Sequence, residues 1–196
     1  MERAVTCYAL LHIVSIPIVL FAFFVCPSPA FSQGPVKIFL YAGQSNAEGV
    51  LASENSNLFP SSSFDEEIMY AWNLKGGNVT LNSGWNHLRK VPMGSRQITH
   101  AGEITAGRKI YGAGLTEVAF IKVTKGGTSL NRDWDPQSGN GMYAHMKEYI
   151  ERKLRELDDR GIPYTIEAIF WHQGEGDTSP SFAAQYERNL QEFIDF

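Results

Sequence analysis

Apolar residues gather in four short runs along the chain, and each run is rich in β-branched and aromatic side chains. The runs cover residues 36–42, 66–72, 115–124 and 164–172. Short, nearly continuous apolar runs are typical of strands that are buried on both faces of a parallel sheet. The pattern therefore predicts four strands of one sheet.

Segments with apolar residues at every third or fourth position lie between these runs and predict helices. The clearest segment covers residues 142–159, and its apolar stripe consists of Tyr143, Met146, Ile150, Leu154 and Leu157. A shorter helix is predicted for residues 101–113, and another begins near Ser181. Residues 53–63 and 75–96 are rich in Ser, Asn, Gly and Pro, which favour loops. Strands that alternate with helices predict an α/β fold with helices on both faces of a parallel sheet.

The composition fits one globular domain and excludes some functions. The chain has 196 residues, of which 43% are hydrophobic and 19% charged, a balance that suits a packed core. The net charge is −4, and Lys and Arg form no cluster. Because nucleic acids are bound by clustered basic residues, we expect no nucleic-acid partner. The two cysteines, Cys7 and Cys26, precede residue 33, so the rest of the chain can form no disulfide and no thiolate metal site.

Residues 1–32 have the pattern of an export signal. An apolar run covers residues 10–25, and the small residues Ala30 and Ser32 stand where a cleavage site requires them. The alternative is an uncleaved membrane anchor, and contact with a membrane is expected only in that case. The pattern therefore predicts an exported protein, secreted or located in the periplasm or cell envelope.

Three of the predicted strands end in clusters of glycine and polar residues. The sequences are "GQSN" at 43–46, "KGGTSL" at 125–130 and "HQGEGD" at 172–177. Because ligand sites in open α/β sheets lie at the carboxyl ends of the strands, these clusters are expected to share one edge of the sheet.

Acyl transfer would explain the residue types in these clusters, since it needs a nucleophile, a base and fixed donors for the oxyanion. Ser45 could be the nucleophile and its own N–H a first donor; alternatively, Ser45 is an ordinary turn residue. The backbone at Gly126–Gly127 could supply a second donor, because glycine lets N–H groups approach a ligand closely. The amide of Gln173 could supply a third, and the carboxylate of Glu175 could orient an imidazole. Asp177 and Ser179 are expected as the two alternative N-caps of the last helix.

Taken together, "GQSNAEG", "KGGTSLNRDW" and "FWHQGEGD" resemble the motifs of the sialate O-acetylesterase-like carbohydrate esterases, a branch of the SGNH hydrolase superfamily. The resemblance extends from about Val36 to the last residue. It implies a flavodoxin-like, three-layer α/β/α fold with a central parallel sheet. It also implies a serine hydrolase that removes O-acetyl groups from carbohydrates and needs no metal or other cofactor.

The resemblance assigns roles to individual residues. Ser45 would be the nucleophile, and Glu175 matches a glutamate that supports the catalytic histidine in some members. The oxyanion hole would consist of Ser45, a glycine of the Gly126 and Gly127 pair, and Gln173. The partner implied is an acetylated carbohydrate substrate, and the sequence does not say which glycan carries the acetyl group.

The histidines depart from the family pattern. The resemblance implies a catalytic histidine in an Asp-x-x-His motif near the C-terminus, and no such motif occurs up to residue 196. From their sequence positions, none of the five histidines fits this role: His12, His87, His100, His145 and His172. We therefore expect residues 33–196 to be the N-terminal part of an esterase domain, without its last strand and helix. Because the members of a catalytic triad act as a unit, this segment by itself should be inactive.

A catalytically inactive carbohydrate-binding module with the same fold is the alternative. Four tryptophans could stack on sugars, although tryptophan more often packs in a core: Trp72, Trp85, Trp134 and Trp171. Ser45-dependent hydrolysis would distinguish the enzyme from the module.

Overall fold

The computed structural model describes residues 34–52, 60–76, 79–92 and 97–195. The chain divides into two units, residues 1–32 and 33–196, and the fold below is that of the second unit. The expected export signal lies outside the described residues. No helix in the described part of the chain is long and apolar enough to cross a bilayer.

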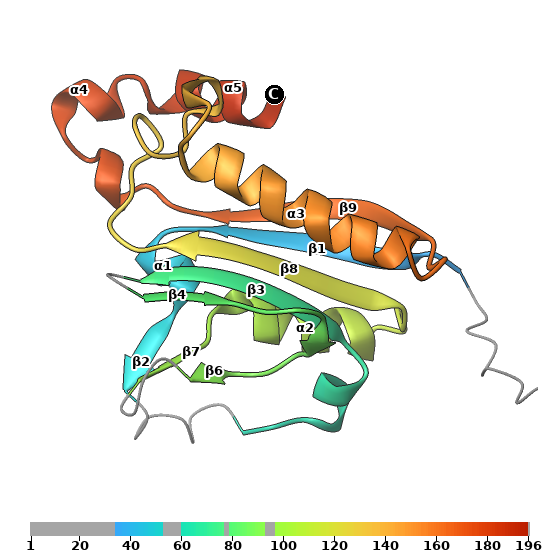
Figure 1. Ribbon diagram of the computed structural model, residues 1–196. Coiled ribbons are helices and arrows are strands. Elements are labelled where there is room, and N and C mark those ends of the chain that lie inside the picture. Colours follow the sequence, from blue (N-terminus) through green and yellow to red (C-terminus); the bar gives the residue numbers. More distant parts are fainter. Residues whose placement is uncertain (1–33, 53–59, 77–78, 93–96, 196) are drawn as a thin grey trace, which may run out of the picture. The chain divides into compact units, whose positions relative to one another are not determined.

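A mostly parallel sheet forms the centre of this unit (Figure 1). Its parallel strands lie side by side in the order β3 (Met69–Gly76), β8 (Val118–Lys125), β1 (Val36–Gly43) and β9 (Tyr164–His172). These are the four predicted strands. β3 begins later than expected, because residues Ser63–Glu66 form a 3-10 helix, η2, with its own capping box at Ser62.

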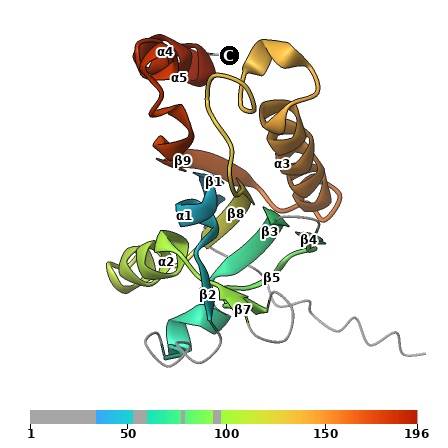
Figure 2. The same ribbon diagram turned by 90° about the vertical axis from the view of Figure 1, so that its left-hand side faces the viewer.

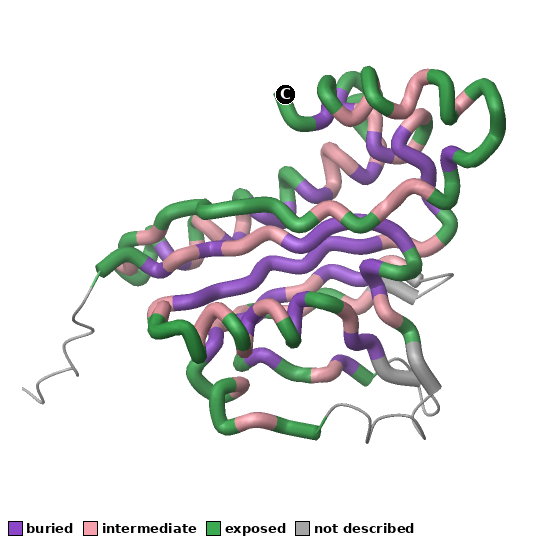
Figure 3. Tube along the Cα trace, turned by 180° about the vertical axis from the view of Figure 1, so that it is seen from behind, coloured by how far each residue is buried: buried purple, intermediate pink, exposed green. Residues whose placement is uncertain are grey.

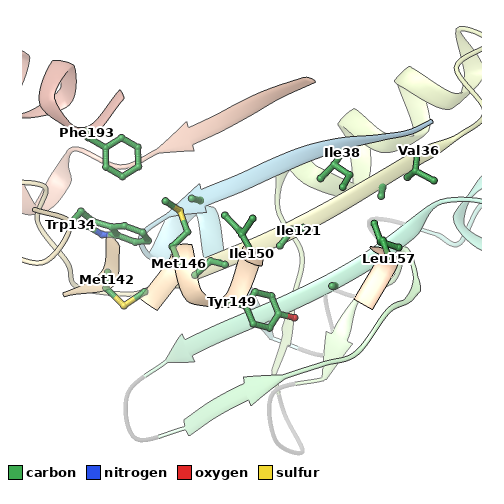
Figure 4. Packing of buried hydrophobic residues seen from close by; sticks show 14 of the residues in the cluster. Val36, Ile38, Ile121, Trp134, Met142, Met146, Tyr149, Ile150, Leu157 and Phe193 are labelled. Carbon is green, nitrogen blue, oxygen red and sulfur yellow. The ribbon is translucent and has the colours of Figure 1, made fainter. Parts of the chain in front are cut away.

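Helices cover both faces of the sheet, as the α/β/α prediction requires (Figure 2). α3 (Met142–Asp158) and Phe193 of α5 (Tyr186–Asp195) pack on one face, and α2 (Gly102–Gly112) packs on the other. A strand points successive side chains to opposite faces, so β1 supplies both layers. Ile38 lies in the cluster with α3, which Figure 4 shows, and Tyr41 lies in the cluster with α2. The three-layer fold is therefore confirmed.

The region 75–96, which was expected to be a loop, contains short strands. β4 (Val79–Asn82) and β5 (Asn86–His87) pair with β3 in antiparallel orientation. β6 (Val91–Pro92) joins β2 (Val50–Ala52) and β7 (Gln97–Thr99) in a separate three-stranded antiparallel sheet. Strands of two to four residues carry too little periodicity to stand out among Gly, Asn and Ser, so the loop prediction was wrong here.

The expectation of strands buried on both faces is confirmed for β8 and wrong for β9. Every residue of β8 from Val118 to Thr124 is buried, whereas most of β9 is exposed (Figure 3). The apolar side chains of Ile166, Ile169 and Phe170 are 50%, 39% and 37% exposed. The reason is the position of β9 at the edge of the described sheet, where β1 is its one paired neighbour.

β1 and β8 lead away from the sheet toward opposite faces. β1 continues into α1 (Ser45–Glu48), whose Ala47 packs in the cluster with α2, whereas β8 leads to α3 on the other face. Ligands of open α/β sheets bind where the connections that follow two neighbouring strands go to opposite faces of the sheet. The carboxyl ends of β1 and β8 are therefore the place where the topology predicts a site.

Candidate active site

The end of β1 lies directly against the end of β9. A Cβ atom on Gly43 would stand 2.0 Å from the carbonyl oxygen of His172, and Gly43 has a φ of 147°. The backbone N–H of Gln44 donates to the same His172 carbonyl at 3.2 Å. Only glycine fits at position 43, and this close approach brings the first and third polar clusters together.

Ser45 is the first residue of α1 and is exposed. The fully buried Ala47 anchors the short helix in the core, so the serine is held at the surface of a firm turn. Ser45 lines an open pocket of about 410 Å³ together with Asn46, His100 and Thr105. A hydroxyl in this position is accessible to a ligand.

Gly126, which belongs to the second polar cluster, lies next to Ser45. A Cβ atom on Gly126 would stand 3.6 Å from Ser45 Cβ and 3.2 Å from Glu48 Oε2. Gly127 has the left-handed φ of 70°, and, its chain neighbours apart, no described residue has an atom within 4 Å of the place where its Cβ would be. The diglycine backbone therefore passes beside Ser45 with open space next to Gly127.

Glu175 forms hydrogen bonds with the side chains of the two residues that flank Ser45. It begins the 3-10 helix η4 (Glu175–Asp177), and its carboxylate accepts hydrogen bonds from the side-chain amides of Gln44 and Asn46. The structure thus brings Ser45, Gly126 and Glu175 into one neighbourhood at the sheet edge.

The side-chain amide of Gln173 forms hydrogen bonds within the protein in this structure. The two hydrogens of its amide point to the carbonyl of Thr128 at 3.1 Å and to Oδ2 of Asp177 at 2.6 Å. The side chain therefore ties the third cluster to the second. Its role as an oxyanion donor stays a prediction.

Asp177 connects two of the clusters, which the sequence analysis missed. It is buried, and its carboxylate accepts hydrogen bonds from the backbone N–H groups of Leu130 at 2.7 Å and Asn131 at 3.0 Å, besides the one from Gln173. Asp177 was expected to cap the last helix, but its partners come from the loop after β8. An acidic residue that ends a glycine-rich cluster was the one sequence signal for this role.

A buried ion pair lies beneath the serine turn. Lys122 Nζ is 2.8 Å from Glu103 Oε1 and donates to the carbonyl of Glu48 at 3.0 Å. Tyr70 donates its hydroxyl hydrogen to the same Glu103 oxygen at 3.3 Å. Burial raises the pKa of Glu48 above its usual range, and a hydrogen bond from the Gly126 backbone and the charge of Lys122 oppose this only in part. The turn that carries Ser45 is thus bound to a buried ion pair through the backbone of Glu48.

Of the histidines that the structure describes, His100 is the one that lines the pocket of Ser45. It is 6% exposed, and burial lowers its pKa, an effect that Glu103 opposes. His145 is placed on the α3 face, where its Nε2 lies 3.0 Å from Asn73 Oδ1. His87 lies in β5 and His172 at the end of β9, and both are exposed. His12 lies outside the described residues.

The remaining candidate groups have structural partners. Trp134 is fully buried, and Trp171 packs edge-on against it with ring centroids 5.0 Å apart. Trp85 donates to the carbonyl of Lys153 at 3.3 Å, and the ring of Trp72 packs at a tilt against that of Tyr70. Among the residues that the structure describes, no three His, Cys, Asp or Glu side chains are grouped so as to hold a metal ion.

The sequence matches a known family over most of its length. The family is described as carbohydrate esterases, sialic acid-specific acetylesterases, and its model matches residues 35–196. The chain therefore belongs to this family of carbohydrate esterases, as the motifs indicated. A comparison with curated proteins found no match.

Two solved structures are similar to this one. A protein of Arabidopsis thaliana is 18% identical with a TM-score of 0.59, and the match covers 83% of this chain and 67% of that one. A carbohydrate acetylesterase from Xanthomonas citri is 16% identical with a TM-score of 0.48, over 80% of this chain and 36% of that one. The likeness to the plant protein supports the α/β fold.

Proposed function

We propose that this protein is a serine esterase that removes O-acetyl groups from glycans and that Ser45 is its nucleophile. The observation that carries the proposal is the contact between Ser45 and the diglycine backbone, with a Cβ position at Gly126 only 3.6 Å from Ser45 Cβ. Membership of a carbohydrate esterase family supports the ester substrate.

The reaction follows from the groups beside the serine. Ser45 Oγ attacks the acetyl carbonyl, its proton passes to a base, and the carbonyl electrons move to oxygen. The N–H groups of Ser45 and Gly127 bind this oxyanion. Gly127 is the better donor of the pair, because the Gly126 backbone already binds Glu48 and the space beside Gly127 is open. Cleavage of the ester C–O bond releases the sugar hydroxyl, and water then frees acetate from Ser45.

The base is proposed to be a histidine encoded after residue 196, on a further strand and helix of the same domain. The exposed apolar side chains of β9 support this, since a strand at the true edge of a sheet rarely exposes several large apolar residues. Reading the frame past Phe196 tests the idea. An Asp-x-x-His motif in that part supports it, and a stop codon with no such motif contradicts it.

Hydrolysis of p-nitrophenyl acetate by the product of the complete reading frame tests the central proposal. Ser45→Ala should lower kcat by about 10³-fold or more, because loss of a nucleophile removes the covalent route. Ser181→Ala, which changes an exposed serine of α4 (Pro180–Ala183), is the matched control and should retain full activity. Equal activity of Ser45→Ala and the wild type would refute the assignment.

Export by residues 1–32 is part of the same proposal. Sequencing the N-terminus of the exported protein should find Gln33 as the first residue. An exported protein that begins before residue 10 would instead favour the membrane anchor.

A further inference from the structure

Glu48 is a buried acid in the same short helix as Ser45, and no step of the proposed reaction uses it. It is the last residue of α1 and is 2% exposed. Its backbone N–H donates to the carbonyl of Gln44 at 2.8 Å, and its own carbonyl accepts from Lys122 Nζ at 3.0 Å. The Glu48 side chain therefore extends from a firmly held point of the turn that carries Ser45.

The Glu48 carboxylate reaches the diglycine turn that follows β8. The backbone N–H of Gly126 donates to this carboxylate, and Oε2 lies 3.2 Å from the place where a Cβ atom of Gly126 would stand. A hydrogen bond to an ionised group is roughly twice as strong as one between neutral groups. Glu48 therefore links the helix of the proposed nucleophile to the turn of the proposed oxyanion donor, Gly127.

Thr128 fixes the other end of the diglycine turn. Its hydroxyl donates to the carbonyl of Lys125 at 2.8 Å, and its carbonyl accepts from the amide of Gln173 at 3.1 Å. These two contacts hold the turn to the end of β8 and to the third polar cluster. Neither of them involves α1, so the hydrogen bond of Glu48 adds a direct link between the turn and the helix of Ser45.

Stability alone does not explain a glutamate at this position. Glu48 Oε1 has no hydrogen-bond partner among the residues that the structure describes, and Lys122 forms its ion pair with Glu103. A buried carboxylate without an ion pair of its own is costly for the folded state. Ionisable groups in such environments are concentrated at functional sites, which indicates a role for this carboxylate.

We propose that Glu48 is a positioning residue, whose carboxylate binds the Gly126 N–H and thereby holds the diglycine turn with the Gly127 N–H directed at the oxyanion formed at Ser45. This inference rests on the proposed esterase function and adds a residue to it. A small displacement of an oxyanion donor slows the reaction steeply. Because the oxyanion exists only after the attack of the serine, the role predicts a change in kcat and not in KM.

Two substitutions of Glu48 test this role with p-nitrophenyl acetate and the product of the complete reading frame. Glu48→Gln keeps a neutral oxygen that can accept from Gly126, and it should lower kcat about threefold. Glu48→Met has a similar length and no strong acceptor, and it should lower kcat about tenfold to 100-fold, less than or similar to the loss of an oxyanion donor. KM should stay within about twofold of the wild type in both variants.

Ile38→Val is the matched control for an effect of stability. Ile38 is fully buried near the start of β1 (Figure 4), whereas Ser45 follows the end of that strand. Loss of a buried methylene lowers stability without a change at the site, so kcat and KM should equal those of the wild type. Thermal melts identify any variant that fails to fold. A loss of kcat in Ile38→Val as large as in Glu48→Met would overturn the inference.

The pH dependence of kcat is a readout that a purely structural role would not alter. Burial raises the pKa of Glu48, and the Gly126 hydrogen bond and the charge of Lys122 oppose this in part. Above this pKa the wild type has a charged acceptor, and below it a neutral acid that resembles glutamine. The ratio of kcat in the wild type to kcat in Glu48→Gln should therefore fall toward one as the pH is lowered from about 8 to about 4.

Titration of the catalytic base affects both proteins alike and cancels in this ratio. The same holds for the other titratable groups on the elements around α1, which are Tyr41, Tyr70, His100, Glu103, Lys122, His172 and Glu175. A ratio that does not change with pH would overturn the inference.

The amide proton of Gly126 reports the contact without any measurement of activity. In protein that is isotope-labelled at glycine, the Gly126 resonance is identified by its absence from Gly126→Ala. Its chemical shift should move with pH as Glu48 titrates in the wild type, and this movement should be absent in Glu48→Gln. The same movement in both proteins would overturn the inference.

The Ser45→Ala variant separates this inference from the proposed function. Wild-type activity in Ser45→Ala would remove the proposed function and the role of Glu48 together. An inactive Ser45→Ala variant with wild-type kcat in Glu48→Met would leave the esterase in place and remove the role of Glu48 alone.

Discussion

Gly126 lies so close to Ser45 that any side chain on the glycine would contact the serine. The Cβ position at residue 126 is 3.6 Å from Ser45 Cβ and 3.2 Å from Glu48 Oε2. The first contact is ordinary van der Waals packing, whereas the second is tight and requires a small shift. The backbone that borders the serine is therefore placed by the absence of a side chain.

Gly126→Ala should lower kcat/KM for p-nitrophenyl acetate by about tenfold, because small displacements of catalytic groups cost activity steeply. Gly84→Ala is the matched control, since, its chain neighbours apart, no described residue has an atom within 4 Å of a Cβ at that position. A Gly126→Ala enzyme with wild-type kinetics would mean that the diglycine backbone does not take part in the reaction.

Glu175→Gln should loosen the turn that carries Ser45. The carboxylate accepts from two amides, Gln44 and Asn46, and a glutamine would direct its own NH₂ group at one of them. We expect kcat to fall about tenfold and the free energy of unfolding to fall by about 1 kcal/mol. Glu187→Gln, an exposed change on α5, should alter neither quantity. Unchanged kcat in Glu175→Gln would exclude the proposed support of the nucleophile.

Asp177→Asn should destabilise the protein by about 2 kcal/mol, because the buried carboxylate accepts from the backbone of Leu130 and Asn131 and from Gln173. Urea unfolding measures this loss. Asp159→Asn provides a comparison at an exposed position, the C-cap residue that follows α3. If both variants unfold at the same urea concentration, Asp177 does not hold the two loops together.

The buried pair of Lys122 and Glu103 should behave as one unit. Lys122→Met alone leaves the carboxylate of Glu103 buried without its counter-charge and should cost about 3–5 kcal/mol. Adding Glu103→Gln should recover part of that loss in a double-mutant cycle. Additive single effects would show that the two charges do not interact.

The raised pKa of Glu48 predicts that the stability of the protein depends on pH. Burial raises its pKa in the folded protein, so the folded state binds this proton more tightly than the unfolded state. Its contribution to stability is therefore present below the unfolded pKa and is lost as pH rises through the folded pKa. Glu48→Gln removes the effect. As the pH rises from about 4 to about 8, the melting temperature of the wild type should therefore fall relative to that of the variant. A constant difference across this range would contradict the shift.

The sequence predicted the parts of the fold and site that depend on local pattern. The strands, the amphipathic helix predicted at 142–159 and the clusters after β1, β8 and β9 follow from periodicity and from the rule that ligand sites lie at strand ends. Because this rule concerns whole strands, it could place Ser45 and Gly126 at one edge without any coordinates.

Other features depend on contacts between distant residues, which a single sequence does not carry. A lysine inside the run "FIKVT" gave no sign that Lys122 meets Glu103, and Asp177 looked like a helix cap. The exposure of β9 could not be predicted for the same reason, because an apolar strand has the same sequence pattern at the centre of a sheet and at its edge. The use of the Gln173 amide by Thr128 and Asp177 was likewise invisible.

Trapping the acetyl-enzyme tests the role of Ser45 most directly. The product of the complete reading frame is mixed with p-nitrophenyl acetate, quenched in acid and digested, and the peptides are analysed by mass spectrometry. The account predicts the added mass of one acetyl group on the peptide that contains Ser45, and no adduct in Ser45→Ala. An acetyl group on another serine, with Ser45 unmodified, would contradict it.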